Sequence, residues 1–214
     1  MHATPPSDDP ATEPCTDTPR RRGRPRSEVA ATAVLDAAYR LSATEGLRGA
    51  TIQAIAAESG VSKMTIYKWW EGRLQLLIDA YMRQATVMLP LSETLPPREA
   101  IHAHVQRYLV ALRGDLGRVQ LAVLAECMAE TGTSEVFVAR YLSVRRKLGV
   151  SVIRRGQRDG SIASQRPAEA LYDQIYGTIF YRFQFGLKGL DRAFVQSLVD
   201  AAFAGDDPKS PAAR

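Results

Sequence analysis

A break at residues 59–62 separates two very short helical patterns, and few arrangements of a chain accommodate such a pair. Thr51 and Ser62 are typical helix N-caps, and each precedes apolar residues at helical spacing. The patterns predict two short helices, over 51–59 and 63–69. Gly60 would supply the positive φ that a sharp reversal needs. Two short helices joined by such a turn make a helix-turn-helix, whose second helix projects from the protein.

Helical periodicity continues through most of the chain, and no alternating β pattern interrupts it. A first helix is expected to begin at Ser27 and to end at Gly46 in a left-handed cap. Glycines and prolines divide the remainder into further helices, expected over 73–88, 98–113, 117–130, 134–158, 167–187 and 191–204. The chain is therefore predicted to be all-α, with an N-terminal three-helix helix-turn-helix domain over 27–72 and a larger helical regulatory and dimerisation domain over 73–204.

Charge is distributed unevenly along a chain whose net charge is +5. Residues 1–19 contain four acidic residues and no Lys or Arg, and they are predicted to be a disordered acidic tail. Five arginines follow in a basic arm over 20–26, and residues 205–214 are expected to be a flexible C-terminus. A dense basic run on a basic chain indicates a polyanionic partner, with DNA the first candidate. A merely solubilising tail is the alternative.

Several protein classes are disfavoured by what the sequence does not contain. No apolar run approaches the roughly 18 residues of a membrane span, so no membrane partner is expected. Cys15 and Cys127 are far apart, which argues against a structural disulfide and fits the cytoplasm. His102 and His104 would point to different sides of a helix, so no metal site is predicted. No phosphate loop or nucleophile motif occurs, so neither an enzyme nor a cofactor is expected.

The stretch from Thr51 to Trp70 resembles the DNA-binding domain of the tetracycline-repressor (TetR) family. Shared features are a Thr at the start of the second helix, an Ile-Ala pair at 55–56, Gly-Val-Ser at the turn, and an aromatic residue three positions after Tyr67. Arg73 takes the place of the Lys that usually begins the family's next helix, and Trp70 stands where the family usually has Phe. The resemblance covers residues 27–80.

The resemblance implies which side chains contact DNA. Thr51 and Tyr67 are expected to bind phosphates on either side of the major groove, and Arg73 to add a phosphate contact at its helix N-terminus. A plain N-cap role for Thr51 and a core position for Tyr67 are the alternatives. Further contacts are expected at base edges for Lys63 and Thr65, at a thymine methyl for Met64, and at the DNA backbone for Lys68.

Part of the basic arm, residues 22–25, resembles the core of an AT-hook. A narrow A·T-rich minor groove concentrates negative potential, which attracts arginines such as Arg22 and Arg24. Gly23 would let the backbone lie deep in the groove, and Pro25 would keep it extended. Such arms are also common before the first helix of TetR-like proteins. The arm is therefore predicted to bind DNA, with an idle solubilising run as the alternative.

For residues 73–204 the resemblance implies a helical core around an inducer pocket, and a dimer face built from the last two long helices. The residues expected in the pocket are Tyr108, Met128, Phe137, Tyr141, Tyr176 and Phe180. Each of these is also an ordinary core residue in type. Their character predicts an apolar or aromatic inducer.

Apolar stripes independently favour dimerisation through residues 167–204. The helix over 167–187 carries two neighbouring stripes, one of Leu171, Ile175, Ile179, Phe183 and Leu187, and one of Tyr172, Tyr176 and Phe180. A helix that is apolar around so much of its circumference must be buried on more than one side. The helix over 191–204 has a similar surface, so a four-helix interface between two subunits is predicted. Closure of a single subunit's core is the alternative.

Basic residues also crowd the helix over 134–158, at Arg140, Arg145, Arg146, Lys147, Arg154, Arg155 and Arg158. A solvated helix face is the favoured explanation, ahead of an anionic ligand or an extra DNA contact. A redox-sensing role for Cys127 is the alternative to a packing role, and packing is favoured because one cysteine on an apolar helix usually lies in the core.

These features predict a ligand-responsive, homodimeric repressor that a small-molecule inducer releases from a palindromic operator. Its partners would be the double-stranded operator, the inducer and a second copy of the chain. An architectural protein that binds A·T-rich DNA with little sequence preference is the alternative. The two differ in competition, because a repressor prefers its operator over bulk A·T-rich DNA.

Overall fold

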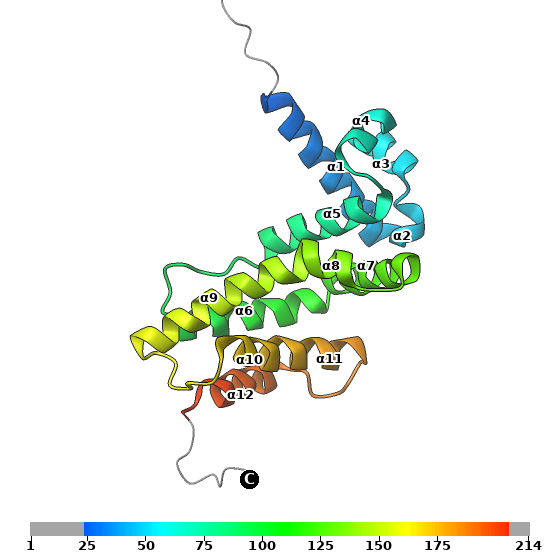
Figure 1. Cartoon of the computed structure of the whole chain (residues 1–214). Coiled ribbons are helices and arrows are strands. Elements are labelled where there is room, and N and C mark those ends of the chain that lie inside the picture. Colours follow the sequence, from blue (N-terminus) through cyan, green and yellow to red (C-terminus); the bar gives the residue numbers. More distant parts are fainter. Residues whose placement is uncertain (1–23, 206–214) are drawn as a thin grey trace, which may run out of the picture.

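The computed structural model describes residues 24–205, with side chains described from residue 27. Within that range the chain consists of helices and their connections, and no strand occurs (Figure 1). An N-terminal head lies at one end of the molecule, and a larger helical body extends from it to the C-terminal helices (Figure 1). The head consists of α1 (Arg24–Thr44), α2 (Gly46–Gly49), α3 (Ile52–Ser59) and α4 (Lys63–Trp69). The predicted all-α class is confirmed.

Capping accounts for the short helices of the head. The Thr51 hydroxyl accepts a hydrogen bond from the backbone N–H of Ala54 at 3.1 Å, and the Ser62 hydroxyl accepts one from that of Thr65 at 3.2 Å. Each bond satisfies an N–H group that the first turn of a helix leaves unpaired. Gly60 has a φ of 69°, in the left-handed region. The predicted caps and the turn between α3 and α4 are therefore confirmed.

The start of α1 differs from the expectation. The helix begins at Arg24 rather than Ser27, so Pro25 lies in its first turn. The prediction that the arm is extended is therefore wrong from residue 24 onward. Proline is compatible with this position, because the N–H groups of a first turn have no partner in the helix. At the other end, Gly46 has the predicted left-handed conformation, with a φ of 72°. Arg22, the side chain of Arg24, and residues 1–19 and 206–214 lie outside the described part of the structure.

The body begins with α5, which packs against α1 in the head and against α7 in the body. Its helices are α5 (Arg73–Met88), α6 (Pro97–Leu112), α7 (Asp115–Thr131), α8 (Glu135–Phe137), η1 (Val138–Leu142), α9 (Ser143–Asp159), α10 (Ala168–Tyr172), η2 (Asp173–Gly177), α11 (Thr178–Gln184) and α12 (Arg192–Phe203). These elements follow the predicted helices closely in their bounds. The last helices, α10 to α12, lie at the far side of the body from α4 (Figure 1).

Two of the predicted helices contain π-helical segments that periodicity did not indicate. The segment η1 joins α8 to α9 without a break, and η2 joins α10 to α11 in the same way. A π turn is rare and is found frequently at functional sites, because the extra residue changes the direction of the side chains that follow. Both π segments contribute side chains to the cavity described below.

A single hydrophobic cluster runs through the head and the body. It includes Val34 and Ile55 in the head, Tyr81 in α5, and Val199 and Phe203 in α12. Protein cores are packed as densely as organic crystals, so a shift of one helix displaces its neighbours. The head and the body are therefore mechanically connected rather than joined by a loose linker.

Most residues of the apolar stripes of the C-terminal helices are buried in the interior of the subunit. Leu171 and Ile179 are fully buried, as are Val195 and Val199 of α12. Closure of the subunit's own core, the alternative explanation, therefore accounts for these residues. The exposed apolar side chains at the end of α11 and just after it are Tyr181, Phe185 and Leu187.

Candidate functional site

The helix α4 is held to the head by Ile66 and presents its other side to solvent. Ile66 is 0% exposed and belongs to the same core cluster as Ile55 of α3. Met64 is 81% exposed. Thr65 is half-buried, and its hydroxyl lies 2.9 Å from that of Ser62. The other predicted DNA contacts at the surface are Thr51, Lys63, Tyr67 and Lys68. A short helix held along one side has the other side available for a major groove.

Arg73, which was predicted to contact a phosphate, is bonded within the protein. Its guanidinium donates to the Leu47 carbonyl at 2.7 Å and forms ion pairs with Glu126 and Glu130 of α7. These bonds come from Nη1 and Nη2, so the N–H of Nε takes no part in them and a phosphate contact by Arg73 stays a prediction. Within the protein, the arginine ties the start of α5 to α2 and α7.

A second polar link joins the end of α4 to the body. The indole N–H of Trp70, the buried residue that follows α4, donates to Oδ2 of Asp79 at 3.0 Å. The same carboxylate accepts hydrogen bonds from Nη1 of Arg140, at 2.9 Å to Oδ1 and 2.8 Å to Oδ2. Arg140 belongs to η1. One carboxylate on α5 therefore connects the end of α4 to a π segment of the body.

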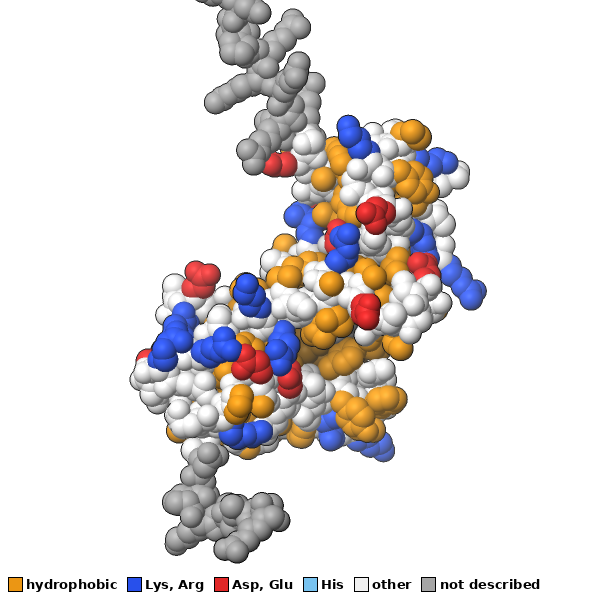
Figure 2. Space-filling model, viewed as in Figure 1, with side chains coloured by type: hydrophobic (Ala, Val, Ile, Leu, Met, Phe, Trp, Pro, Cys, Tyr) orange, Lys and Arg blue, Asp and Glu red, His pale blue; other side chains and the backbone are white. Residues whose placement is uncertain are grey.

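The body contains a cavity of about 450 Å³, a volume typical of small-molecule sites. Its walls come mainly from α6, α7, the helix α8–η1–α9 and the helix α10–η2–α11. Figure 2 shows hydrophobic side chains gathered between α8 and α11. The residues contributed by η1 are Val138, Tyr141 and Leu142, and those contributed by η2 are Asp173, Tyr176 and Gly177.

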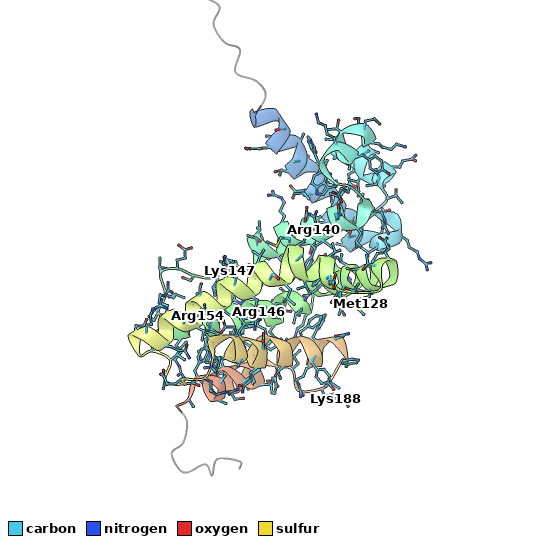
Figure 3. All side chains as sticks on the ribbon, viewed as in Figure 1. Met128, Arg140, Arg146, Lys147, Arg154 and Lys188 are labelled. Atoms are coloured by element: carbon cyan, nitrogen blue, oxygen red, sulfur yellow. The ribbon has the colours of Figure 1, made fainter. Side chains whose placement is uncertain are left out.

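Five of the six residues predicted for the pocket line this cavity, namely Tyr108, Phe137, Tyr141, Tyr176 and Phe180. That they bind a ligand stays a prediction. The predicted place of Met128 in the pocket is wrong, because this residue is 52% exposed and does not line the cavity (labelled on α7 in Figure 3). Its neighbour Cys127 takes the buried position, and one residue along a helix turns the side chain by about 100°.

Sequence reasoning did not place the polar residues of the cavity, chiefly His104, Gln120 and Arg145, in the predicted pocket. For His104 a signal existed. It lies three residues after Ile101 and four before Tyr108, which places it on the buried face of α6. A polar residue in the apolar phase of a helix is therefore the pattern that would have identified it.

Gln120 is the centre of a buried hydrogen-bonded cluster. Its Oε1 accepts a hydrogen bond from the Tyr81 hydroxyl at 2.8 Å, and the Tyr108 hydroxyl lies 3.4 Å from the same oxygen. The hydroxyl of Tyr81 is also 3.3 Å from that of Tyr141. Burial raises the pKa of all three tyrosines, so the phenols stay neutral and able to donate.

His104 is the centre of a second cluster. Arg145 donates to Nε2 of His104 at 2.8 Å and to the Leu89 carbonyl at 2.7 Å. Because a guanidinium can only donate, Nε2 accepts and the ring hydrogen is on Nδ1, 2.8 Å from the Tyr176 hydroxyl. Burial, and then the positive charges of Arg145 and Arg107, lower the pKa of His104 to about 3. The ring is therefore neutral at pH 7.

Within residues 24–205, no group of three or more His, Cys, Asp and Glu is arranged to hold a metal ion. No helix of that range is both long enough and apolar enough to cross a membrane. Cys127 is buried, and its thiol donates to the Thr133 carbonyl at 3.4 Å. Cys127 therefore packs in the core, and its thiol is not exposed.

Family models match both parts of the chain. The model described as "Bacterial regulatory proteins, tetR family" matches residues 34–80, and the one described as "Tetracyclin repressor-like, C-terminal domain" matches residues 91–202. The HTH-type transcriptional regulator YdeS of Bacillus subtilis is 31% identical over 185 residues, which are 86% of this chain and 93% of YdeS. The two family models together cover most of the head and the body, and the match to YdeS extends over 86% of the chain.

Solved structures agree with this assignment. The TetR family transcription regulator SCO0332 superposes with a TM-score of 0.73 and 27% identity, covering 81% of this chain and 96% of that one. RolR, solved in complex with resorcinol, shares the fold with a TM-score of 0.55 and 16% identity, covering 83% of this chain and 87% of RolR. Proteins of this kind are DNA-binding regulators and not enzymes. With its helix-turn-helix head and helical body, this chain belongs to the TetR family of bacterial transcriptional regulators.

Proposed function

We propose that this protein is a cytoplasmic, homodimeric repressor that leaves a palindromic operator when a small molecule occupies the cavity. The observation that carries the proposal is the bonded connection from the exposed helix α4 to the wall of an apolar cavity of about 450 Å³. A ligand that favours one arrangement of the body would change the separation of two recognition helices, which must match major grooves about 34–36 Å apart. The complex of RolR with resorcinol supports a small-molecule ligand in this fold.

The proposed dimer face lies within residues 167–204. Tyr181, Phe185 and Leu187 are exposed apolar side chains there, and the rings of Tyr181 and Phe185 lie 5.2 Å apart. Covering such a patch with a second copy removes apolar area from water. A two-fold axis at this face would give one assembly two copies of α4, as a palindromic operator requires.

DNA competition tests the proposed function. Fluorescence anisotropy of the full-length protein would be measured with DNA from upstream of its own gene and with random A·T-rich DNA, both at physiological salt. A repressor is expected to prefer its operator by about 10³-fold or more, and to lose it when an active compound from a small-molecule library is added. Equal affinity for the two DNAs would overturn the proposal in favour of the architectural alternative.

Lys63→Ala and Lys68→Ala are expected to affect DNA binding differently. Both side chains are exposed on α4, but Lys63 is in its first turn and is proposed to reach base edges. Its removal is expected to cost about 1–3 kcal/mol at the operator and to change the order of preference among operator variants. Lys68→Ala is expected to weaken binding to all sequences alike and to reduce the slope of log K against log salt by about 0.9. Identical profiles for the two variants would contradict the separate roles.

Asp79→Asn is expected to reduce the response to ligand while leaving both binding activities in place. The variant removes the charge that joins Trp70 at the end of α4 to Arg140 on η1. Coupling between two sites is typically about 1–3 kcal/mol. The factor by which the releasing compound lowers operator affinity is therefore expected to be smaller in the variant than in the wild type, by about 5-fold or more. Anisotropy with and without that compound measures the change.

Asp36→Asn is the matched control for this coupling. It removes a carboxylate that pairs with Arg83 at 3.0 Å and so also links α1 to α5, but it has no bond to η1. Its response to ligand is expected to equal that of the wild type. Equal losses in the two variants would show that the Asp79 link does not carry the coupling.

A further inference from the structure

The basic residues of the helix α8–η1–α9 do not share one role. Figure 3 labels several of them along the helix. Three are matched by carboxylates on other helices: Arg140 by Asp79, Arg146 by Asp173, and Arg154 by Glu169. The positive charges of these three side chains are therefore compensated within the subunit.

Arg145, one position before Arg146, lines the cavity and has neutral partners. Both of its hydrogen bonds come from Nη2, at 2.7 Å to the Leu89 carbonyl and at 2.8 Å to Nε2 of His104. A guanidinium has N–H donors on all three nitrogens, so those on Nε and Nη1 remain for another acceptor. A positive charge beside a mostly apolar cavity is unfavourable unless an anion compensates it.

The neighbours His104, Tyr172 and Tyr176 leave the positive charge of Arg145 uncompensated. His104 cannot compensate the charge, because its ring is neutral, with a pKa lowered to about 3 by burial and by Arg145 and Arg107. Arg145 also acts on the cavity tyrosines, where its charge lowers the pKa of Tyr172 and Tyr176 against the larger opposite effect of burial. The positive charge of the guanidinium therefore acts on the aromatic side chains of the cavity wall.

Tyr176 offers a second donor at the same place. The Nδ1 hydrogen of His104 points to the Tyr176 oxygen at 2.8 Å, as required by the bond from Arg145 to Nε2. The hydroxyl hydrogen of Tyr176 is then available to an acceptor in the cavity. A guanidinium and a phenol beside each other make a site for a carboxylate, because charge-assisted hydrogen bonds are stronger than neutral ones.

We propose that the cavity binds an organic monoanion, a carboxylate carried by an aromatic or aliphatic body, with Arg145 and Tyr176 donating to the carboxylate. This inference rests on the proposed function and specifies the chemistry of its inducer. The apolar walls take the body of the ligand, and the one uncompensated guanidinium takes its single charge. A second negative charge on the ligand would find no uncompensated cation among the described residues of the cavity, because Arg146, which also lines it, is already bonded to Asp173 at 2.6 Å.

Two matched pairs of probes test this inference on the full-length protein: 2-naphthoate with 2-naphthamide, and decanoate with decanamide. The members of each pair differ only in the head group, and isothermal titration calorimetry gives their dissociation constants. The wild type is expected to bind at least one acid about tenfold or more tightly than its amide, the usual effect of a hydrogen bond to a charged group. Arg145→Met is expected to reduce that preference to about twofold or less.

Two further variants keep this test independent of folding. Lys147→Met removes a positive charge from the same helix at an exposed position, and it is expected to keep the wild-type preference. Arg145→Lys keeps the charge and is expected to keep most of the preference. Circular dichroism confirms that each variant is folded.

Three results would overturn the inference. Equal affinity of the wild type for acid and amide would show that the cavity binds small molecules without reading charge, and the proposed function would stand. Equal loss of preference in Lys147→Met and Arg145→Met would assign the effect to general charge. Binding of no probe would exclude organic monoanions of this size as ligands of the cavity. The DNA competition experiment would then decide the proposed function separately.

Discussion

Ile66→Ala is expected to lower the free energy of unfolding by about 2–5 kcal/mol and to weaken operator binding by tenfold or more. Ile66 is the buried residue of α4 and is 0% exposed. The substitution leaves a cavity behind a helix of 7 residues, which is too short to be stable without its tertiary contacts. Since domains are stable by only about 5–15 kcal/mol, a loss of this size removes the fixed orientation of α4. Urea unfolding followed by tryptophan fluorescence, and anisotropy with operator DNA, measure the two effects.

Met64→Ala is the matched control on the same helix. Met64 is also apolar but is 81% exposed, so its truncation is expected to change the free energy of unfolding by no more than about 0.5 kcal/mol. Any effect on DNA binding should then depend on a thymine in the operator. Wild-type stability and DNA affinity in Ile66→Ala would contradict the attachment of α4 to the head through this residue.

Acidification from pH 7 to pH 5 is expected to cost the folded protein about 2 kcal/mol through His104. Burial first, and then Arg145 and Arg107, lower the pKa of this ring in the folded protein to about 3, from 6.5 for an exposed ring. Between these two pKa values the unfolded chain binds a proton that the folded protein excludes. The stability is therefore fully present above pH 6.5 and is lost as the pH falls toward 3.

Urea unfolding at the two pH values measures this loss. His104→Asn is expected to be less stable at pH 7, because Arg145 and Tyr176 lose a partner, but to lose about 2 kcal/mol less than the wild type on acidification. His102→Asn removes the other histidine of α6 and is expected to keep most of the wild-type loss. The carboxylate of Asp200, whose pKa is lowered from 3.8, titrates below this range. Equal losses in the wild type and His104→Asn would show that the folded protein binds the proton.

The head illustrates how much short-range chemistry can predict. The hydroxyls of Thr51 and Ser62 bond to N–H groups three residues further along, and Gly60 takes a φ that other residues avoid. Each interaction needs only a few adjacent residues, so its signal is complete within the local sequence. The bounds of α3, α4 and α5, the all-α class and the TetR resemblance were predictable for this reason.

Contacts between helices that are distant in sequence were not predictable in the same way. The local sequence around Arg73 does not indicate that Glu126, 53 positions later, lies beside it on α7. Cys127 and Met128 are adjacent in the chain, yet the first is buried and the second exposed. Periodicity indicates the direction of a side chain only to within about one residue's turn of 100°, and it does not identify the helix that lies in that direction.

The residues around the cavity show most clearly which features depend on neighbouring residues and which depend on the packing of distant helices. Local sequence alone accounts for the helix-turn-helix, its caps and the concentration of arginines near residue 145. Only the packing of α9 against α6 and α10, and of η1 against α5, paired Arg140 and Arg146 with carboxylates and left Arg145 beside the cavity with neutral partners. The physical reason is that caps and turns are interactions of neighbouring residues, whereas the compensation of a charge depends on which helix lies opposite it.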